Sequence, residues 1–313
     1  MPFDLDKMKR AALDFASQGV FLGTSSWKYP GWRGQLYDDS RYIWRGRFSE
    51  SRLNKYCLTE YSQVFKTVCV DAAYYKFPDR AYLEHLASQV PPDFLFAFKV
   101  TDQITVRRFP NLPRFGPRAG SANEDFLNAA VFESDFLEAC KAVRQHIGLL
   151  IFEFSHFYPA DFERGRDFVD ALDQFLSKLP RAWPYGVEIR NRHFLHPNYF
   201  ATLARYNVTH IYNSWQDMPS LEEQLALPDS LTNPDTLGAR LLLRPGRKYE
   251  EAVKLFSPYD RIKDPYAEGR AAAVKLIQQA QNRPGKAKTF IYVNNRFEGN
   301  ALETLDAIVD EAG

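Results

Sequence analysis

The chain has 313 residues, of which 45% are hydrophobic and 25% charged, and its 40 basic and 39 acidic residues leave a formal net charge of +1. This size and composition are typical of one large globular domain that buries enough apolar surface to fold without disulfide or metal cross-links. The near-neutral charge argues against a protein that coats nucleic acid through a general excess of positive charge, but it leaves a local basic site open.

The cysteines and the N-terminal residues bear on the compartment. Cys57, Cys69 and Cys140 have no metal-ligand spacing and are odd in number, which favours a reduced protein. The first fifteen residues lack the apolar segment of a secretory signal, and no run approaches the roughly 18 apolar residues of a membrane span. We therefore expect a cytoplasmic protein that does not enter a membrane.

Eight short apolar runs are predicted to be strands, and polar residues gather where each run ends. Residues 1–19 come first and are predicted to form an amphipathic lead-in helix. The predicted strands are Val20–Ser25, Lys66–Asp71, Phe94–Val100, Gly148–Phe154, Tyr185–Arg190, Val208–Asn213, Ala239–Arg244 and Thr289–Asn294. The predicted helices lie at 51–64, 79–89, 124–146, 162–179, 197–206, 264–282 and 300–311, with a weaker one at 221–227. Eight strand-plus-helix units predict an α/β fold, a single closed (β/α)8 TIM-type barrel over residues 20–313.

Three long connections follow predicted strands, at residues 27–49, 101–123 and 214–238. In a parallel barrel the ends of the strands form the active-site face, so all three loops are expected to rise there. Long loops in compact domains are usually functional or mobile. The alternative is that they only decorate the surface.

The exit of the first strand is rich in hydroxyl and aromatic side chains, namely Thr24, Ser25, Trp27, Tyr29 and Trp32. Aromatic rings beside hydroxyl groups suit a sugar ring or a nucleobase. The alternative is a plug of aromatic side chains that closes the mouth of the barrel. The sequence leaves both interpretations open.

Charged side chains end the fourth and fifth predicted strands. Strand alternation places Glu188 and Arg190 on one side, and His193 follows them. Glu153 ends the neighbouring strand, so Glu153 and Glu188 are candidates for an acid/base pair. An ion pair with a purely structural role is the alternative. His156 and His193 also make an oxygen-rich divalent metal site with the two glutamates conceivable.

Lys99 ends the third predicted strand among aromatic residues. A lysine in such surroundings is a candidate nucleophile or base with a lowered pKa, whereas a lysine that pairs with Asp71 is structural. No zinc-binding or nucleotide-binding motif is present, so the sequence indicates no cofactor.

The seventh and eighth predicted strands suggest an anion site. Arg244 and Arg247 follow the seventh strand, and Tyr292, Asn294 and Asn295 end the eighth. TIM barrels often bind phosphate with the loops after these two strands, and arginine suits phosphate or carboxylate. The alternative is a solvated basic turn.

The same residues resemble the DUF72 (YecE-like) family. The resemblance lies in the segments 23–32, 67–71, 94–105, 187–190, 244–249 and 292–295, and it spans roughly residues 20–311. It implies a TIM-type barrel and a candidate site but no reaction, because the family is named for having no established function. Cys69, Glu153 and Pro245 depart from its pattern, where a Glu, a Gln and a His are usual, which favours a divergent branch.

Three functional hypotheses follow from these residues. The first is an enzyme that binds a small phosphorylated or carboxylated, sugar-like substrate at the barrel mouth and carries out acid/base chemistry or hydrolysis. The second, which the net charge disfavours, is a nucleic-acid-processing barrel that uses the arginine-rich loop at 107–118. The third is a catalytically inactive ligand-binding protein. The sequence indicates no oligomeric state.

Overall fold

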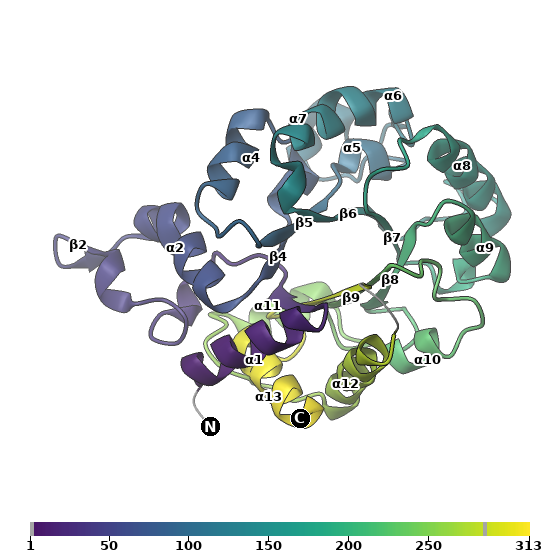
Figure 1. Cartoon of the computed structure of the whole chain (residues 1–313). Coiled ribbons are helices and arrows are strands. Elements are labelled where there is room, and N and C mark those ends of the chain that lie inside the picture. The colour runs from purple at the N-terminus through teal and green to yellow at the C-terminus, as the bar shows by residue number, and fades with distance from the viewer. Residues whose placement is uncertain (1–2, 284–286) are drawn as a thin grey trace.

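Eight parallel strands form one sheet that curls into a nearly closed barrel (Figure 1). This computed structural model describes residues 3–283 and 287–313, so the first two residues of the predicted lead-in segment lie outside it. The strands are β1 (Val20–Thr24), β4 (Thr67–Val70), β5 (Leu95–Lys99), β6 (Ile147–Phe154), β7 (Tyr185–Ile189), β8 (Thr209–Ser214), β9 (Thr236–Leu241) and β10 (Lys288–Val293). Their order around the barrel is β1-β10-β9-β8-β7-β6-β5-β4. The predicted TIM-type barrel is confirmed.

The barrel closes between β1 and β4 through a single bridge, in which Ser25 pairs with Cys69. Gly23 makes this approach possible, because a Cβ atom there would lie 2.3 Å from the backbone oxygen of Thr67. A side chain at Gly23 would therefore push β1 and β4 apart.

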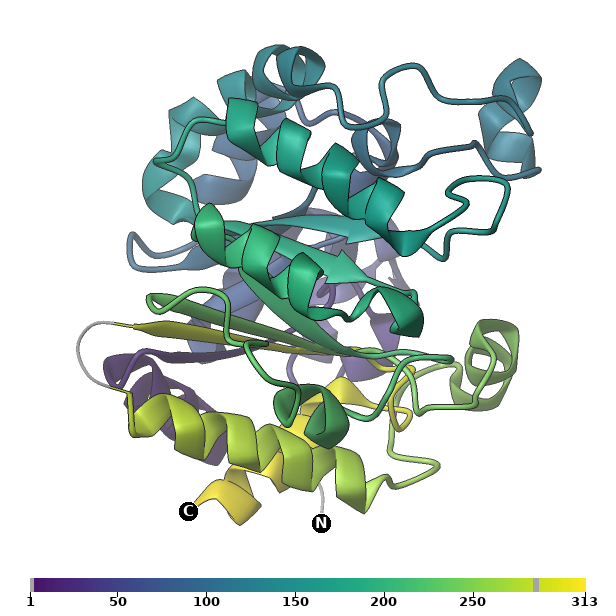
Figure 2. The same ribbon diagram turned by 90° about the vertical axis from the view of Figure 1, so that its right-hand side faces the viewer.

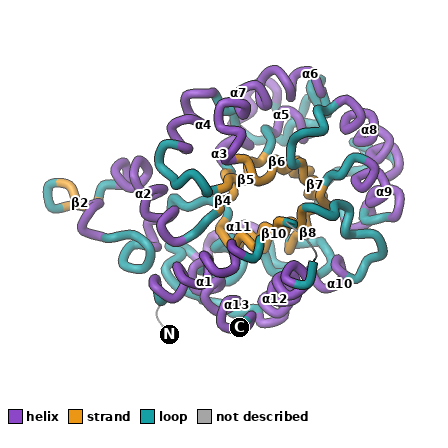
Figure 3. The backbone as a smooth tube through the Cα atoms, in the orientation of Figure 1, coloured by secondary structure: helices purple, strands orange, loops and turns teal. Residues whose placement is uncertain are grey.

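Helices surround the strands on the outside of the ring (Figure 3), and the view turned by 90° shows them on both sides of the strands (Figure 2). They are α1 (Leu5–Ser17), α2 (Glu50–Val64), α3 (Ala72–Tyr75), α4 (Arg80–Ala87), α5 (Asp102–Thr105), α6 (Ala129–Val131), α7 (Glu138–Cys140), α8 (Gly165–Lys178), α9 (Pro197–Arg205), α10 (Leu221–Leu225), α11 (Tyr249–Phe256), α12 (Ala267–Gln281) and α13 (Ala301–Ala312). None of the helices within these described residues is long and apolar enough to cross a membrane.

Local sequence explains where several helices begin. The side chains of Ser49, Asp79 and Asn300 accept hydrogen bonds from backbone N–H groups in the first turns of α2, α4 and α13. Such caps satisfy donors that have no partner inside the helix. In α1, Met8, Ala12 and Phe15 are buried as the predicted amphipathic pattern requires, whereas Leu5 is exposed.

Two shells of apolar side chains stabilise the barrel. The larger shell lies between the strands and the helices, and a second cluster contains the inward-facing Phe21, Cys69, Leu95, Ala97, Leu149, Ile151, Ile211, Phe290 and Tyr292. Because side chains alternate along a strand, the next inward position toward the carboxyl end of β4, β5 and β6 falls on Asp71, Lys99 and Glu153. The apolar interior therefore gives way to a charged layer at the mouth.

Two predicted elements differ clearly from the structure, and α3, α5 and α11 were not predicted. The seventh barrel strand, β9, begins and ends three residues earlier than predicted, because its first half contains Thr236 and Gly238 and resembles a turn. The helix α11 was missed and lies in the loop after β9. The predicted helix at 124–146 begins at Ala129 and includes a π-helical turn, Phe132–Leu137.

Candidate functional site

The charged layer at the carboxyl ends of the strands is built around Arg240. This side chain is 2% exposed and lies on β9, beside Asn213 of β8 and Tyr292 of β10 in the sheet register. Its Nη1 donates to Glu153 Oε2 and Glu188 Oε2, each at 2.6 Å, and its Nη2 lies 3.4 Å from Asp71 Oδ1. Burial alone would lower the pKa of Arg240, but Glu188, Glu153 and Asp71 raise it well above its usual range. Arg240 therefore stays charged and ties three strands together.

Two further cations complete the layer. Lys99 Nζ lies 2.9 Å from Glu153 Oε2 and 3.7 Å from Asp71 Oδ1. Arg190 Nη2 lies 2.8 Å from Glu153 Oε2 and 3.0 Å from Glu188 Oε1. The formal charges of this layer sum to zero, since three cations (Lys99, Arg190 and Arg240) face three carboxylates (Asp71, Glu153 and Glu188).

This arrangement settles the direction of two pKa shifts. Burial would raise the pKa of Glu153, but Arg190, Lys99 and Arg240 outweigh burial and hold it well below its usual value. Burial would lower the pKa of Lys99, but Glu153 and Asp71 raise it overall. The pKa of Lys99 is therefore raised and not lowered as expected, and Lys99 pairs with Glu153 at 2.9 Å more closely than with the expected Asp71 at 3.7 Å.

Around the mouth, aromatic rings lie against two cations of the charged layer and against a third cation, Arg296. Lys99 Nζ lies 4.1 Å from the ring centre of Tyr74, and the Arg190 guanidinium lies 3.7 Å from that of Trp215. Trp215 is 6.5 Å from Tyr249, whose ring the Arg296 guanidinium approaches at 4.6 Å. We call these six residues the mouth ring. Contacts of this kind attract a cation to the electron-rich face of an aromatic ring.

Arg296 differs from the other cations of the mouth ring. Within residues 3–283 and 287–313 it forms no ion pair, and its Nε is buried without a hydrogen-bond partner. Tyr29 and Tyr259 lie near the same guanidinium, and their rings meet edge to face at 5.7 Å. Burial raises the pKa of Tyr29, and Arg296 opposes part of that rise. Arg296 is thus a cation that keeps its charge available at the mouth.

The predicted aromatic wall of the first loop divides in two. Trp27 and Trp32 are buried, and Trp32 donates to Asn295 Oδ1 at 3.2 Å, so both belong to the plug that closes the barrel. Tyr29 alone reaches the mouth, through the contacts described above. Thr24 is buried against the Tyr61 hydroxyl at 3.0 Å and holds β1 in place.

The remaining small polar candidates of β1 and β10 also separate. Tyr292 lies inside the barrel, with its hydroxyl 2.9 Å from that of Thr67. Asn294 accepts a hydrogen bond from the backbone N–H of Arg296 at 2.9 Å and so positions that arginine. Ser25 Oγ and Asn295 Nδ2 are buried without a partner in the described part of the chain.

Arg244 and Arg247 do not join the charged layer. Arg244 is 43% exposed and lies 3.6 Å from Asp264, which also pairs with Arg247. Arg244 lines a separate cavity of about 400 Å³ between the β8–α10 loop and the first turns of α12. The structure therefore places these two arginines around one carboxylate instead of beside Arg190.

The histidines and the conceivable metal site have little support. His193 and His156 are exposed, and Glu153 and Glu188 are occupied by guanidinium groups. Across residues 3–283 and 287–313 no group of three His, Cys, Asp or Glu side chains is arranged to hold a metal ion.

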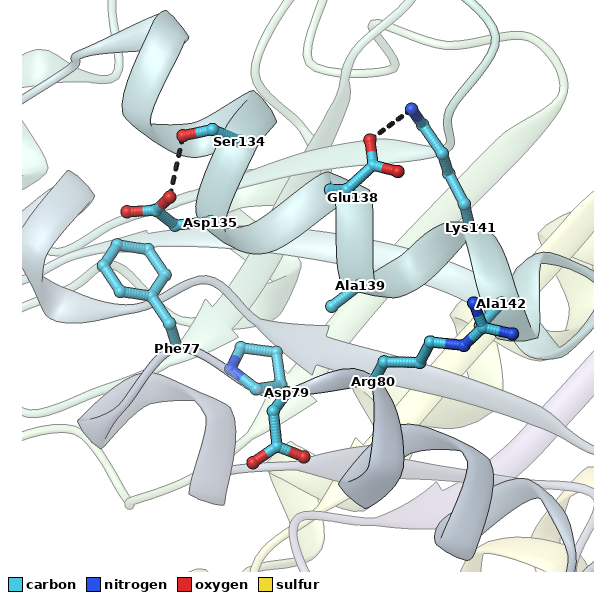
Figure 4. Close-up of a pocket in the computed structure, with 10 residues that line it drawn as sticks. Phe77, Asp79, Arg80, Ser134, Asp135, Glu138, Ala139, Lys141 and Ala142 are labelled. Atoms are coloured by element: carbon cyan, nitrogen blue, oxygen red, sulfur yellow. Dashed lines mark hydrogen bonds and ion pairs between the residues drawn. The ribbon is translucent and has the colours of Figure 1, made fainter.

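A surface hollow lies beside α4 and α7 (Figure 4). It has a volume of about 730 Å³ and carries several charged side chains, including Asp79, Arg80 and Asp135. Its Glu138 pairs with Lys141 along the same helical segment, and Ser134 Oγ donates to Asp135 at 2.8 Å. These local pairs leave no convergent set of groups, so the barrel mouth is the better candidate.

The sequence profile of the family described as "Protein of unknown function DUF72" matches residues 21–313. The chain belongs to the DUF72 family. Among curated proteins, none matches the sequence.

Solved structures of DUF72 proteins share the fold. A DUF72 family protein from Enterococcus faecalis V583 is 16% identical, with a TM-score of 0.59 over 93% of this chain and 96% of that one. A DUF72 family protein from Thermotoga maritima MSB8 is 18% identical, with a TM-score of 0.58 over 92% of this chain and 98% of that one. At this identity the likeness shows the fold alone, in agreement with the predicted family and barrel.

Sequence reasoning missed five residues of this DUF72 site: Arg240, Tyr74, Trp215, Tyr249 and Arg296. For Arg240 a signal was present, because an arginine in the middle of an otherwise apolar strand is costly to bury without partners. The other four lie in the connections after β4, β8, β9 and β10, where only the folded chain brings them to one place.

Proposed function

We propose that the barrel mouth binds a small anionic molecule, phosphorylated or carboxylated and sugar-like, and that the protein is an enzyme that acts on it by acid/base chemistry or hydrolysis. The observation that carries this proposal is Arg296, a mouth cation without a carboxylate partner among the described residues. A buried guanidinium donor without a partner is costly, and an anion would satisfy it. The loop after the eighth barrel strand is also a common phosphate position in this fold.

Tyr29 and two aromatic members of the mouth ring, Trp215 and Tyr249, suit the rest of such a ligand. Tyr29, Trp215 and Tyr249 each offer a ring face or edge near one of the cations. Aromatic faces pack well against the apolar face of a sugar, while Ser25 Oγ and Asn295 Nδ2 supply polar contacts. The charged layer, whose formal charges sum to zero, lies below these side chains and forms the rigid base of the site.

Among the three carboxylates of the charged layer, Asp71 is best placed to exchange protons with a ligand. Its side chain is 26% exposed, whereas Glu153 and Glu188 are buried and each bound by two arginines. A general acid or base must reach the reacting atom directly or through one water. We therefore assign the proton transfer to Asp71, with Lys99 beside it, and give Glu153 and Glu188 a positioning role in place of the catalytic one first expected.

A thermal-shift screen of phosphorylated sugars and organic acids tests the binding. A ligand at 100 times its dissociation constant should stabilise the protein by about 2.7 kcal/mol. The shift should be lost in Arg296→Gln and kept in Arg244→Ala, because Arg244 lies in the separate cavity. A shift lost only in Arg244→Ala would place the ligand there and refute the proposal.

The chemistry has its own test. Asp71→Asn should keep the ligand-induced shift and lose turnover of the same ligand. A ligand recovered unchanged from the wild type after long incubation would support the inactive binding protein instead.

The nucleic-acid-processing alternative gains no support from the loop at 107–118. Arg107, Arg114 and Arg118 stack on Phe126, Phe115 and Phe109 respectively, and Arg114 also pairs with Asp102 at 2.8 Å. These arginines hold their own loop together. Arg114, which also forms an ion pair, is the least available of the three to a phosphate backbone.

A further inference from the structure

A short hairpin in the loop after β1 extends away from the barrel, beyond α2 (Figure 1). Its strands are β2 (Ile43–Trp44) and β3 (Arg47–Phe48), joined by a tight turn in which Arg45 and Gly46 have φ of 51° and 76°. Two such residues in succession are typical of the turns that join hairpins directly. Phe48 packs against the core between strands and helices, whereas Ile43, Trp44, Arg45 and Arg47 are exposed, and none of these residues belongs to the mouth ring.

The tip of this hairpin carries an unusual combination of side chains. Trp44 is 57% exposed, although tryptophan is normally well buried. The guanidinium groups of Arg52 and Arg45 lie 5.0 Å and 5.9 Å from its ring centre. In the parts of the chain that the structure describes, Arg45, Arg47 and Arg52 form no ion pair, and Arg52 Nε is buried without a partner. An exposed aromatic ring therefore lies among three uncompensated positive charges.

A hollow of about 270 Å³ lies beside the hairpin, lined by Arg41, Tyr42, Arg52 and Tyr56. Arg41 pairs with Glu60 at 3.1 Å, and Arg33 pairs with Asp39 at 3.2 Å, so these two acidic side chains are already engaged, while Glu50 at the start of α2 is exposed to solvent. The Tyr56 ring is 44% exposed. Arg52 thus belongs both to the hollow and to the face of Trp44.

We propose that this hairpin and the hollow beside it bind single-stranded nucleic acid. Trp44 and Tyr56 supply faces on which unpaired bases stack, and Arg45, Arg47 and Arg52 supply charges for the phosphates between them. The charge complementarity identifies the partner, because three unpaired arginines around an aromatic ring suit a chain that alternates phosphates with flat rings. The chain's net charge of +1 agrees with a contact at one local site and not with binding through a general excess of positive charge.

An anionic membrane surface is the other chemistry that a basic tryptophan hairpin suggests, but the side chains favour it less. Within the hairpin strands only Ile43 and Trp44 are exposed apolar residues, since Phe48 is half-buried beneath Arg33, and the exposed Tyr56 of the hollow carries a polar hydroxyl. Two apolar side chains offer little to the lipid interface.

Fluorescence anisotropy with a labelled twelve-nucleotide oligothymidylate tests the proposal on the full chain. Binding should weaken with salt with a log–log slope of about −2, which is roughly −0.7 for each of three arginine–phosphate contacts. Trp44→Ala should weaken binding roughly 5- to 150-fold with little change in slope, which corresponds to about 1–3 kcal/mol of lost stacking. Trp44→Phe should retain most of the affinity.

Matched variants distinguish binding at the hairpin from a general effect of positive surface charge. Arg47→Ala with Arg52→Ala should reduce the slope by about 1.4, for two lost contacts. Arg80→Ala with Arg166→Ala, two exposed arginines on α4 and α8, should change neither affinity nor slope. Absence of binding, or equal binding by wild type and Trp44→Ala, would overturn the proposal. Binding to phosphatidylserine vesicles but not to the oligonucleotide would overturn it in favour of a membrane contact. The mouth variant Arg296→Gln should bind the oligonucleotide as the wild type does, so the two proposals fail independently.

Discussion

Removing one member of the charged layer should expose how strongly its six charges depend on one another. Glu153→Gln leaves three cations facing two carboxylates, and Arg240→Gln leaves two cations facing three. Two unit charges about 4 Å apart interact by about 4 kcal/mol at an effective dielectric constant of 20. Each substitution also removes the cost of burying one charge, which offsets part of the lost interaction energy. Each single variant should therefore lose about 3–5 kcal/mol of unfolding free energy, as is usual when one partner of a buried pair is removed.

The double variant should behave differently from the sum of the two singles. Glu153→Gln with Arg240→Gln restores neutrality with two cations and two carboxylates, so we expect a coupling energy of about 2 kcal/mol or more in urea unfolding. The exposed pair Arg80–Glu84, at 2.7 Å, is the control and should give about 0–1 kcal/mol. Additive single effects, or a coupling no larger than the control's, would refute the view that these side chains form one interdependent layer.

The remaining predictions concern acid stability and barrel closure. The folded-state pKa of Glu153 is depressed, so its ionised carboxylate contributes to the unfolding free energy above the unfolded-state pKa of about 4.3. This contribution is lost as the pH falls through the folded-state pKa. The unfolding free energy of Glu153→Gln should therefore depend less on pH below about pH 4.3 than that of the wild type. Burial lowers the pKa of His210 to about 3 in the folded protein, whereas in the unfolded chain it is about 6.5. Below about pH 6.5 the unfolded chain therefore binds more protons than the folded protein, and the unfolding free energy falls as the pH is lowered. His210→Asn should remove this dependence between pH 7 and 5, and a wild-type unfolding midpoint that stays constant over that range would contradict it. Gly23→Ala should cost about 1–3 kcal/mol or more, because the new methyl group meets the backbone of Thr67, and an unchanged urea midpoint would show that β1 and β4 tolerate separation.

The alternation of apolar residues along the sequence was enough to predict β5, β6 and β7, three of the strands that supply the charged layer. In β5 and β6 the alternation that buries Ala97 and Ile151 also fixes the direction of Lys99 and Glu153, and the pairing of Glu153 with Glu188 follows from adjacent strands. The same rule failed on β9. A start at Ala239 directed attention to Arg244, whereas the strand begins at Thr236 and its inward arginine is Arg240.

The mouth ring shows why the rest was out of reach. Tyr74, Trp215, Tyr249 and Arg296 come from four separate loops, and their contacts depend on how those loops pack over the barrel. Residue type alone also could not separate Tyr29 from Trp27 and Trp32, since all three follow the same strand. Burial by Asn295 and its neighbours makes Trp32 structural and leaves Tyr29 at the mouth.

Crystals soaked in tungstate would test anion binding at the mouth most directly, because this phosphate-like oxyanion contains a strong X-ray scatterer. We expect a tungsten position within hydrogen-bond reach of the Arg296 guanidinium, bounded by Tyr29 and Tyr249, that disappears in Arg296→Gln. Tungstate found only in the cavity of Arg244, or absent from the mouth at saturating concentration, would contradict it.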